Sequence, residues 1–318
     1  MFKFCFQNPY FGGPSLSEDL VRLKFVGCMV GCAVGDALGS SFGVFHGRWT
    51  DDTHMMIGVA ESLIAKKGFD GNHMAWAFIK NYEMEPWRGY ASGPPQVFKW
   101  IKAGIPWNEA SKRLFGGVGS YGNGAAMRVA PVGLLYHDDL EKLRSVAYAQ
   151  SLITHAHELG IEGAVLQAFA IALATKEDPS KGLNVYTFLE RLLGLTNSTV
   201  YREKLETALS LLKEKPNKHK IVERLGNTVE AYNSVPTAIY CFLCNHQSFE
   251  KAVAYAVSLG GDRDTIAAMT GAISGAYHGV KAIPEHWLNK LEKKAYIEKL
   301  AEDLWKLKRQ YSSNTRFC

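Results

Sequence analysis

Two short acidic stretches carry the side chains whose types and spacing best suit chemistry. They read Gly260-Gly261-Asp262-Arg263-Asp264-Thr265 and Trp49-Thr50-Asp51-Asp52-Thr53. In each stretch, two carboxylates and a hydroxyl stand where a helix-forming run begins. Hard cations such as Mg²⁺ take a few oxygen ligands from the protein and the rest from water and substrate phosphate. Two stretches with the same chemistry therefore predict one shared cation site.

Helix capping is the alternative interpretation of both stretches. Asp and Thr are favoured N-cap residues, and an Asp in the first turn offsets the helix dipole. A cap, however, needs only one side-chain acceptor. Each stretch supplies two neighbouring carboxylates, which repel one another unless a positive charge lies between them. Taken singly each stretch fits a cap, but taken together they favour the cation site.

A glycine-rich segment, residues 116–124, holds five glycines among nine residues. Backbone amides in such a loop can cradle a phosphate, above all at the start of a helix. The loop lacks a Walker lysine and serine, and no predicted strand precedes it, so neither nucleotide-binding fingerprint applies. A flexible surface loop is the alternative.

The elements that must position these residues all show helical patterns. The first predicted helix starts at a capping box, Ser15 with Glu18, and runs through Leu38. Its glycines recur every fourth residue and share one face, so another helix can pack closely there: Gly27, Gly31, Gly35 and Gly39. Asp36 interrupts this apolar helix, either as a buried hydrogen-bonded carboxylate or as a group that supports the cation site.

Further along the chain, residues 125–136 are predicted to form a helix that Pro131 bends. His155 stands beside a helix end, where a histidine usually caps or fills the core. A last amphipathic helix is expected over residues 295–309.

No run of alternating strands appears, so the fold class is all-α, a compact single-domain helical bundle with the ligand and metal loops at one end. We expect residues 1–17 to form an N-terminal tail, 18–309 the domain and 310–318 a C-terminal tail.

Composition narrows the class of protein. Of 318 residues, 47% are hydrophobic, which is enough for a large core. The net charge is +5, and the Lys and Arg residues are spread along the chain. They do not form a basic stripe interleaved with aromatic residues, so we expect no direct nucleic-acid binding. No apolar run appears long enough for a membrane span. We expect a monomer in an intracellular compartment: the cytoplasm, the nucleus or a mitochondrion.

The six cysteines support a reducing setting, since they are few for this length and no secretory signal precedes them. Two pairs have metal-like spacings, Cys28 with Cys32 and Cys241 with Cys244. Both pairs lie in apolar, helix-like runs. We therefore interpret them as buried thiols rather than as a zinc site.

The order of these motifs resembles the ADP-ribosylglycohydrolase family, compact all-α enzymes with two Mg²⁺ ions. The resemblance rests on Gly35-Asp36-Ala37-Leu38-Gly39, Thr50-Asp51-Asp52-Thr53, Gly119-Ser120-Tyr121-Gly122-Asn123-Gly124-Ala125-Ala126-Met127-Arg128, Thr154-His155-Ala156 and the stretch at Gly260. Two further segments, Gly226-Asn227 and residues 234–242, are most similar to the type three branch. That branch cleaves serine-linked ADP-ribose, poly(ADP-ribose) and O-acetyl-ADP-ribose. The resemblance runs from about Leu23 to Leu304.

The resemblance implies a set of site residues. One Mg²⁺ would be held by Thr50, Asp51, Asp52 and Asp264, and the other by Asp262, Asp264 and Thr265. Asp51, Asp52 and Asp262 would thereby position the catalytic water. The loop Gly119, Ser120, Tyr121, Gly122, Asn123 and Gly124 would wrap the diphosphate and inner ribose, with Phe115 and Val229 at the adenine and His155 in contact with the ligand.

Three departures from the family pattern bear on activity. A catalytic glutamate on a mobile flap would fall at Gly43, and no acidic residue lies between Asp36 and Asp51. Arg263 replaces a small residue; pointing inward it would compete with a metal for the carboxylates, whereas pointing outward it would be only a surface charge. Val118 stands where the type three branch has a lysine.

The sequence therefore predicts a Mg²⁺-dependent hydrolase that cleaves the bond between ADP-ribose and an O-linked acceptor, with ADP-ribose or ADP-ribosylated proteins as partners. Hydrolysis of arginine-linked ADP-ribose is the alternative chemistry. A protein without hydrolase activity is a further alternative. Because the flap glutamate is missing, the chain could bind ADP-ribose without cleaving it, or reuse the fold structurally.

Overall fold

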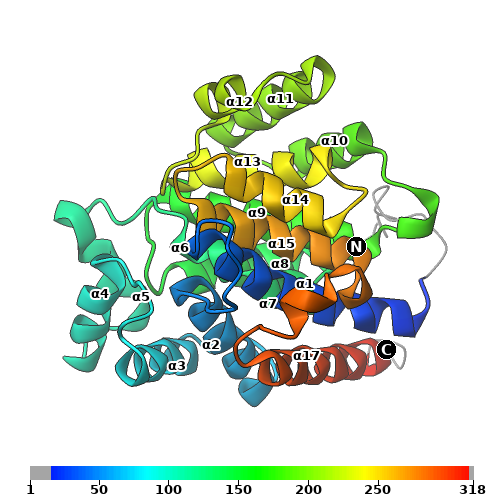
Figure 1. Ribbon diagram of the computed structural model, residues 1–318. Helices are drawn as coiled ribbons and strands as arrows, with labels where there is room; N and C mark the ends of the chain where they lie inside the picture. Colours follow the sequence, from blue (N-terminus) through cyan, green and yellow to red (C-terminus); the bar gives the residue numbers. More distant parts are fainter. Residues whose placement is uncertain (1–15, 315–318) are drawn as a thin grey trace, which may run out of the picture.

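The computed structural model describes residues 16–314, and this part of the chain is helical, with one isolated β-bridge between Gly122 and Glu230 (Figure 1). The all-α, single-domain prediction is confirmed. The elements are α1 (Glu18–Ser40), α2 (Asp51–Lys66), α3 (Gly71–Met84), α4 (Gly93–Lys102), α5 (Trp107–Ala110), η1 (Ser111–Gly117), α6 (Gly124–Met127), α7 (Ala130–Leu135), α8 (Leu140–Ser151), α9 (Glu158–Lys176), η2 (Pro179–Lys181), α10 (Val185–Leu195), α11 (Thr199–Glu214), α12 (Lys218–Leu225), α13 (Ala231–Cys244), α14 (Phe249–Ser258), α15 (Arg263–His278), η3 (Val280–Ala282), α16 (Glu285–Leu288) and α17 (Lys294–Asn314).

Helices α1 and α15 form the centre of the molecule and lie against each other along their glycine faces. A Cβ added at Gly31 would lie 2.4 Å from the carbonyl oxygen of Gly271, and one added at Gly39 would lie 2.4 Å from Cα of Asp264. The predicted glycine face is therefore confirmed as a helix-packing surface. Because Gly39 lies in the last turn of α1 and Asp264 in the first turn of α15, the close packing brings the two acidic segments to the same end of the pair.

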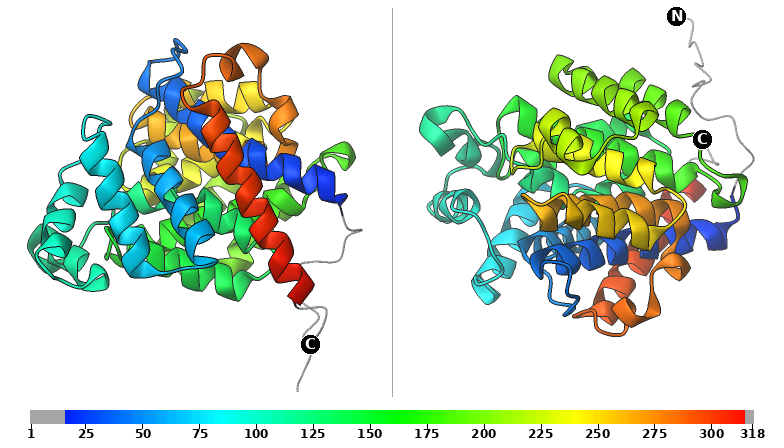
Figure 2. Two further views of the ribbon diagram at one scale, coloured as in Figure 1. Left: turned by 90° about the horizontal axis from the view of Figure 1, so that it is seen from below. Right: turned by 45° about the horizontal axis from the view of Figure 1, so that its top comes forward.

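The other helices cover this pair. Helices α9, α13 and α14 pack on α15, and α2 and α17 pack on α1, as the two views of Figure 2 show. Among the described helices, α9 alone has the length and composition to cross a membrane, contrary to the expectation that no apolar run is long enough. Most of its apolar window is buried inside the protein, as in the core helix of a soluble domain.

Three local expectations change at helix ends. The N-cap of α1 is Ser17, whose side chain accepts a hydrogen bond from the Leu20 N–H, whereas Ser15 lies outside the described residues. The helix predicted over residues 125–136 is two short helices, α6 and α7, because a proline has no N–H to continue a helix and Pro131 instead stands in the first turn of α7. Helix α17 continues to Asn314 rather than ending at 309.

The cysteines within the described residues are free thiols. Cys28, Cys32 and Cys241 are buried, and burial raises the pKa of each thiol, so they stay neutral and behave as small apolar side chains. The interpretation of these three as core residues is confirmed, while Cys244 lies at the surface.

Candidate active site

Asp36 of α1 ties the first acidic stretch to the centre of the fold. Its side chain is fully buried. One carboxylate oxygen accepts hydrogen bonds from the N–H of Thr50 at 2.9 Å, from the N–H of Thr53 at 3.1 Å and from the Thr53 hydroxyl at 2.6 Å. Burial raises the pKa of Asp36 to about 6, while these hydrogen bonds oppose the rise. The first of the two interpretations of Asp36 is confirmed, since it is a buried hydrogen-bonded carboxylate that positions the start of α2, and its support of a cation site stays a prediction.

Thr50 is the N-cap of α2, so the capping role falls to a hydroxyl and leaves the carboxylates free for another role. Thr50 Oγ1 accepts from the Asp52 N–H at 3.4 Å and donates to Asp52 Oδ2 at 2.9 Å. The other carboxylate oxygen of Asp52, Oδ1, is buried and has no hydrogen-bond partner within the described residues. A buried acceptor without a donor is costly, so this oxygen suits a cation.

The second acidic stretch is held by the glycine loop and by Asn227. The Asp262 N–H donates to the Asn227 carbonyl at 2.8 Å, and Asp262 Oδ2 accepts from Asn123 Nδ2 at 2.6 Å. Thr265 Oγ1 donates to Asp262 Oδ1 at 3.3 Å. Gly261 has φ of +62°, and an added Cβ would lie 2.0 Å from the Asn227 carbonyl oxygen, so this turn requires glycine. Asp262 thus faces the glycine loop.

Together, Thr50, Asp51, Asp52, Asp262, Asp264 and Thr265 form what we call the acidic centre. The pKa of Asp51 is raised to about 8, first by burial and then by the charge of Asp36. Burial raises the pKa of Asp52 well above its ordinary value, and that of Asp262 to about 6. The charge of Asp264 contributes to each of these rises. The carboxylates therefore share one electrostatic environment, in which each negative charge disfavours the others.

These residues fit hard cations by donor chemistry, since every candidate ligand is an oxygen and Asp52 Oδ1 lacks a partner. Within residues 16–314, however, no three His, Cys, Asp or Glu side chains converge closely enough to cage an ion by themselves. The three carboxylates expected at one ion, Asp51, Asp52 and Asp264, would therefore have to draw together as it binds, with threonine hydroxyls, water and substrate completing the coordination.

The glycine loop is anchored at its C-terminal half, so the alternative of a freely flexible surface loop does not describe residues 119–124. The Asn123 N–H donates to the Val229 carbonyl at 2.9 Å, and the Ala231 N–H donates to the Tyr121 carbonyl at 3.0 Å. A Cβ added at Gly124 would lie 2.6 Å from Cε1 of His155. The loop therefore has a fixed path between the 227–231 segment and His155.

His155 supports the glycine loop from behind. It is nearly fully buried, and its Nδ1 lies 2.8 Å from the Thr154 hydroxyl, which accepts from Arg128 at 2.7 Å. Burial, with the Arg128 charge, lowers the pKa of His155 to about 3, so the ring is neutral. Sequence reasoning missed the buried network of Arg128, Gln150 and Thr154 that orients it. An arginine directly after the glycine-loop motif was the available signal. The predicted contact of His155 with a ligand stays a prediction.

Phe115 and Val229 present apolar side chains beside the glycine loop. Phe115 is 63% exposed and Val229 60% exposed. Exposed apolar groups next to a candidate phosphate cradle suit the faces of a planar base. Their role at the adenine stays a prediction, as does the effect of Val118, which is also exposed.

Arg263 does not reach into the acidic centre. Its guanidinium lies over the ring of Phe42, 4.5 Å from the ring centroid, and Phe42 is an exposed residue of the loop after α1. Of the two orientations considered for Arg263, the outward one is found. Its charge is held at the surface by an aromatic face rather than by the carboxylates of the acidic centre.

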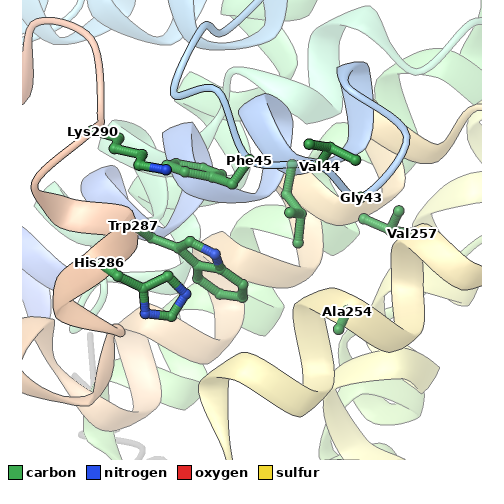
Figure 3. Close-up of a pocket in the computed structure, with 9 residues that line it drawn as sticks. Gly43, Val44, Phe45, Ala254, Val257, His286, Trp287 and Lys290 are labelled. Carbon is green, nitrogen blue, oxygen red and sulfur yellow. The ribbon is translucent and has the colours of Figure 1, made fainter.

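Gly43, at the expected position of the flap glutamate, lies away from the acidic centre. It lines a pocket with Val257 of α14 and Trp287 of α16, and no residue of the acidic centre lines that pocket (Figure 3). Phe45 anchors the loop there, with its ring centroid 5.8 Å from that of Trp287. The short loop is thus fixed against α14 and α16.

The loop between α3 and α4 also meets the acidic centre, which sequence reasoning missed. The Asp51 N–H donates to the Arg88 carbonyl at 2.8 Å, and a Cβ added at Gly89 would lie 3.5 Å from Asp51 Oδ1. A Gly/Pro-rich loop with one arginine carries no specific chemical signal. Only the folded chain shows that this loop borders the site.

The sequence and the fold are both similar to those of proteins described as ADP-ribosylglycohydrolases or ADP-ribosyl hydrolases. The sequence model of the ADP-ribosylglycohydrolase family matches residues 17–314. ADP-ribosylhydrolase ARH3 of Homo sapiens is 37% identical over 288 aligned residues, covering 80% of this chain and 78% of the relative. ADP-ribosylarginine hydrolase Tri1 of Pseudomonas putida is 24% identical, covering 81% of this chain and 66% of the relative. A solved structure described as an ADP-ribosylglycohydrolase-related protein complex superimposes with a TM-score of 0.72 at 26% identity, covering 91% of this chain and 99% of that chain.

Proposed function

The chain belongs to the ADP-ribosylglycohydrolase family and is a glycohydrolase, and from this we propose that it releases ADP-ribose from O-linked acceptors in a Mg²⁺-dependent reaction. The acceptors are serine-linked ADP-ribose, poly(ADP-ribose) and O-acetyl-ADP-ribose. The observation that carries the proposal is the hydrogen bond from Asn123 to Asp262, because it joins the phosphate-cradling loop directly to the acidic centre.

The acidic centre would hold two Mg²⁺ ions. Thr50, Asp51, Asp52 and Asp264 are the proposed ligands of one, and Asp262, Asp264 and Thr265 are those of the other. A divalent cation held by these residues would supply polarisation of ribose hydroxyls and activation of a water molecule. The unpartnered Asp52 Oδ1 and the mutual repulsion of the carboxylates support this assignment.

The protein's own residues supply positioning. Amides of the glycine loop bind the diphosphate, and the neutral His155 ring holds the loop's path from behind. With the diphosphate fixed, the outer ribose lies at the acidic centre, beside Asp262. A glycosidic bond breaks through an oxocarbenium-like state, so a fixed sugar geometry lowers the barrier.

The test is release of free ADP-ribose from a serine-ADP-ribosylated peptide, with Mg²⁺ and with EDTA, beside an arginine-linked substrate. Mg²⁺-dependent release from serine is the expected result. Asp262→Asn should abolish turnover, while the control Asp303→Asn, in an exposed ion pair on α17, should leave it unchanged. Full turnover by D262N would contradict the proposal.

The same assay distinguishes two alternative functions from the proposed one. Release from arginine alone would favour the chemistry named for the Pseudomonas putida relative. Release from neither substrate, with ADP-ribose still bound in calorimetry, would favour a binding protein, which the position of Gly43 away from the acidic centre motivates.

A further inference from the structure

A second pocket opens next to the acidic centre, on the side of the α3–α4 loop. It has a volume of about 460 Å³, and its walls include Thr50, Trp87, Arg88 and Gly89. This volume falls within the range of ordinary ligand pockets, about 300 to 1,000 Å³. The glycine loop meets the Asp262 side of the acidic centre, whereas this pocket meets the Asp51 side, through the hydrogen bond from the Asp51 N–H to the Arg88 carbonyl.

The floor of the pocket is rigid and balanced in charge. Arg88 lies over the buried ring of Trp49, 3.8 Å from its centroid, and donates to Glu292 at 2.6 and 2.8 Å. Arg88 also pairs with Glu85 at 2.6 Å, and Lys293 pairs with Glu85 at 2.7 Å. Two carboxylates therefore face two cations. Because these side chains are already held by ion pairs, a ligand that binds on them does not have to immobilise them. The entropy cost of binding is therefore lower.

Two side chains of this pocket are presented to solvent. Trp87 is 74% exposed, although a tryptophan of this size is usually largely buried. Arg48 is also exposed and lines the pocket, and within the described residues its side chain has no ion-pair partner. Exposed tryptophan and arginine beside a preformed floor are the residue types that dominate binding energy at protein interfaces.

We propose that this pocket, at Trp87 and Arg48, is the acceptor subsite, which binds the peptide segment that flanks the ADP-ribosylated residue. The proposal rests on the proposed function, because it places the ADP-ribose at the glycine loop and the scissile bond at the acidic centre. The acceptor must then leave the acidic centre on another side, and the Trp87 pocket has Thr50 of the acidic centre in its wall.

Charge selects a peptide over a second ADP-ribose unit. A further unit of poly(ADP-ribose) brings a diphosphate, but the charges of the floor are already paired, so among the described residues that line the pocket Arg48 alone is left to bind it. A peptide brings little net charge, and its backbone and side chains can pack on the Trp87 ring while Arg48 pairs with a carbonyl or an acidic side chain.

The experiment compares two substrates that differ only beyond the glycosidic bond: a short serine-ADP-ribosylated peptide and O-acetyl-ADP-ribose, whose acceptor is too small to reach Trp87. Trp87→Ala should lower kcat/KM for the peptide relative to O-acetyl-ADP-ribose by about tenfold, the scale of a tryptophan hot spot. Trp76→Ala is the matched control, since Trp76 is a 51% exposed tryptophan on α3 that does not line the pocket, and it should leave the ratio unchanged.

Several results would overturn the inference. Equal losses for both substrates in W87A would show that Trp87 supports the acidic centre and not the acceptor. Poly(ADP-ribose) is assayed as a third substrate, and a loss in W87A confined to it would assign the pocket to a second ADP-ribose unit. If the wild type turns over no substrate, the proposed function fails, and calorimetry decides the inference. Tighter binding of the peptide than of free ADP-ribose, lost in W87A, would support the subsite, and equal affinities would remove it.

Discussion

At the scale of single residues, the site depends on buried polar groups whose partners come from distant parts of the chain. Asp36 is buried with three donors from the Thr50–Thr53 turn, so its carboxylate is compensated. Asp52 Oδ1 has no such donor. The difference separates a carboxylate that builds the site from one that is available for binding.

His155 gives a pH-dependent prediction. Burial and the Arg128 charge hold its folded-state pKa at about 3, against an ordinary 6.5. The unfolded chain therefore binds a proton between pH 6.5 and 3 that the folded protein does not. The stability that this neutral ring provides is fully present above pH 6.5 and is lost as the pH falls through that window.

We expect the wild type to lose about 2 kcal/mol more free energy of unfolding than His155→Asn between pH 7 and pH 5, because asparagine does not titrate. Chemical unfolding at pH 7 and at pH 5 gives the change in the free energy of unfolding for each protein. The other titrating groups are the same in both proteins, so their contribution cancels when the two changes are subtracted. Parallel pH profiles for the two proteins would show that the ring is not held neutral.

At the scale of elements, two helix N-termini meet at the acidic centre. Helix α2 begins at Asp51 and α15 begins at Arg263. The positive ends of both helix dipoles point to the same place, which favours negative charge there, both of carboxylates and of a bound phosphate. Their relative position is set by the glycine contact between α1 and α15, because Asp36 lies on α1 and Asp264 lies on α15.

The glycine contact can be tested with Gly31→Ala. The added Cβ would lie 2.4 Å from the Gly271 carbonyl oxygen, so the helices must move apart. We expect a loss of about 1–3 kcal/mol in the free energy of unfolding, together with lower turnover. Gly93→Ala in α4 is the control, because its Cβ would meet only Leu114 Cδ1 at an ordinary 3.5 Å. Equal stability of the two variants in urea unfolding would refute the tight-packing account.

At the scale of the whole molecule, the acidic centre is assembled from both ends of the chain. Its residues come from positions 50–52 and 262–265, which only folding brings together. An ion bound by both segments therefore binds the folded protein and not the unfolded chain, so its binding free energy adds to the stability of the fold.

We accordingly expect Mg²⁺ to raise the Tm relative to EDTA, with about 2.7 kcal/mol of added stability when the ion is present at about 100 times its Kd. Asp52→Asn should lose most of this shift, whereas Asp303→Asn should keep it. Thermal unfolding of the three proteins at matched ionic strength gives the result. A Tm that rises equally in D52N would mean that the ion binds elsewhere.

The sequence alone determined the fold class and the identity of the site motifs. Helical periodicity and the absence of alternating strands predicted an all-α protein, and four glycines at a spacing of four predicted that another helix packs closely on α1. Both follow from local geometry, because side-chain period and glycine size are properties of short segments. The roles of the individual ligand and metal residues stay predictions.

Only the tertiary structure decided which residues face the site. It turned Arg263 outward onto Phe42, placed Gly43 against α14 and α16, and brought the α3–α4 loop to Asp51. It also divided the helix predicted over residues 125–136 between Met127 and Ala130, so that Pro131 stands in the first turn of α7. These outcomes depend on contacts between segments far apart in sequence, and a side chain's direction is set by the neighbours that packing supplies rather than by its own residue type.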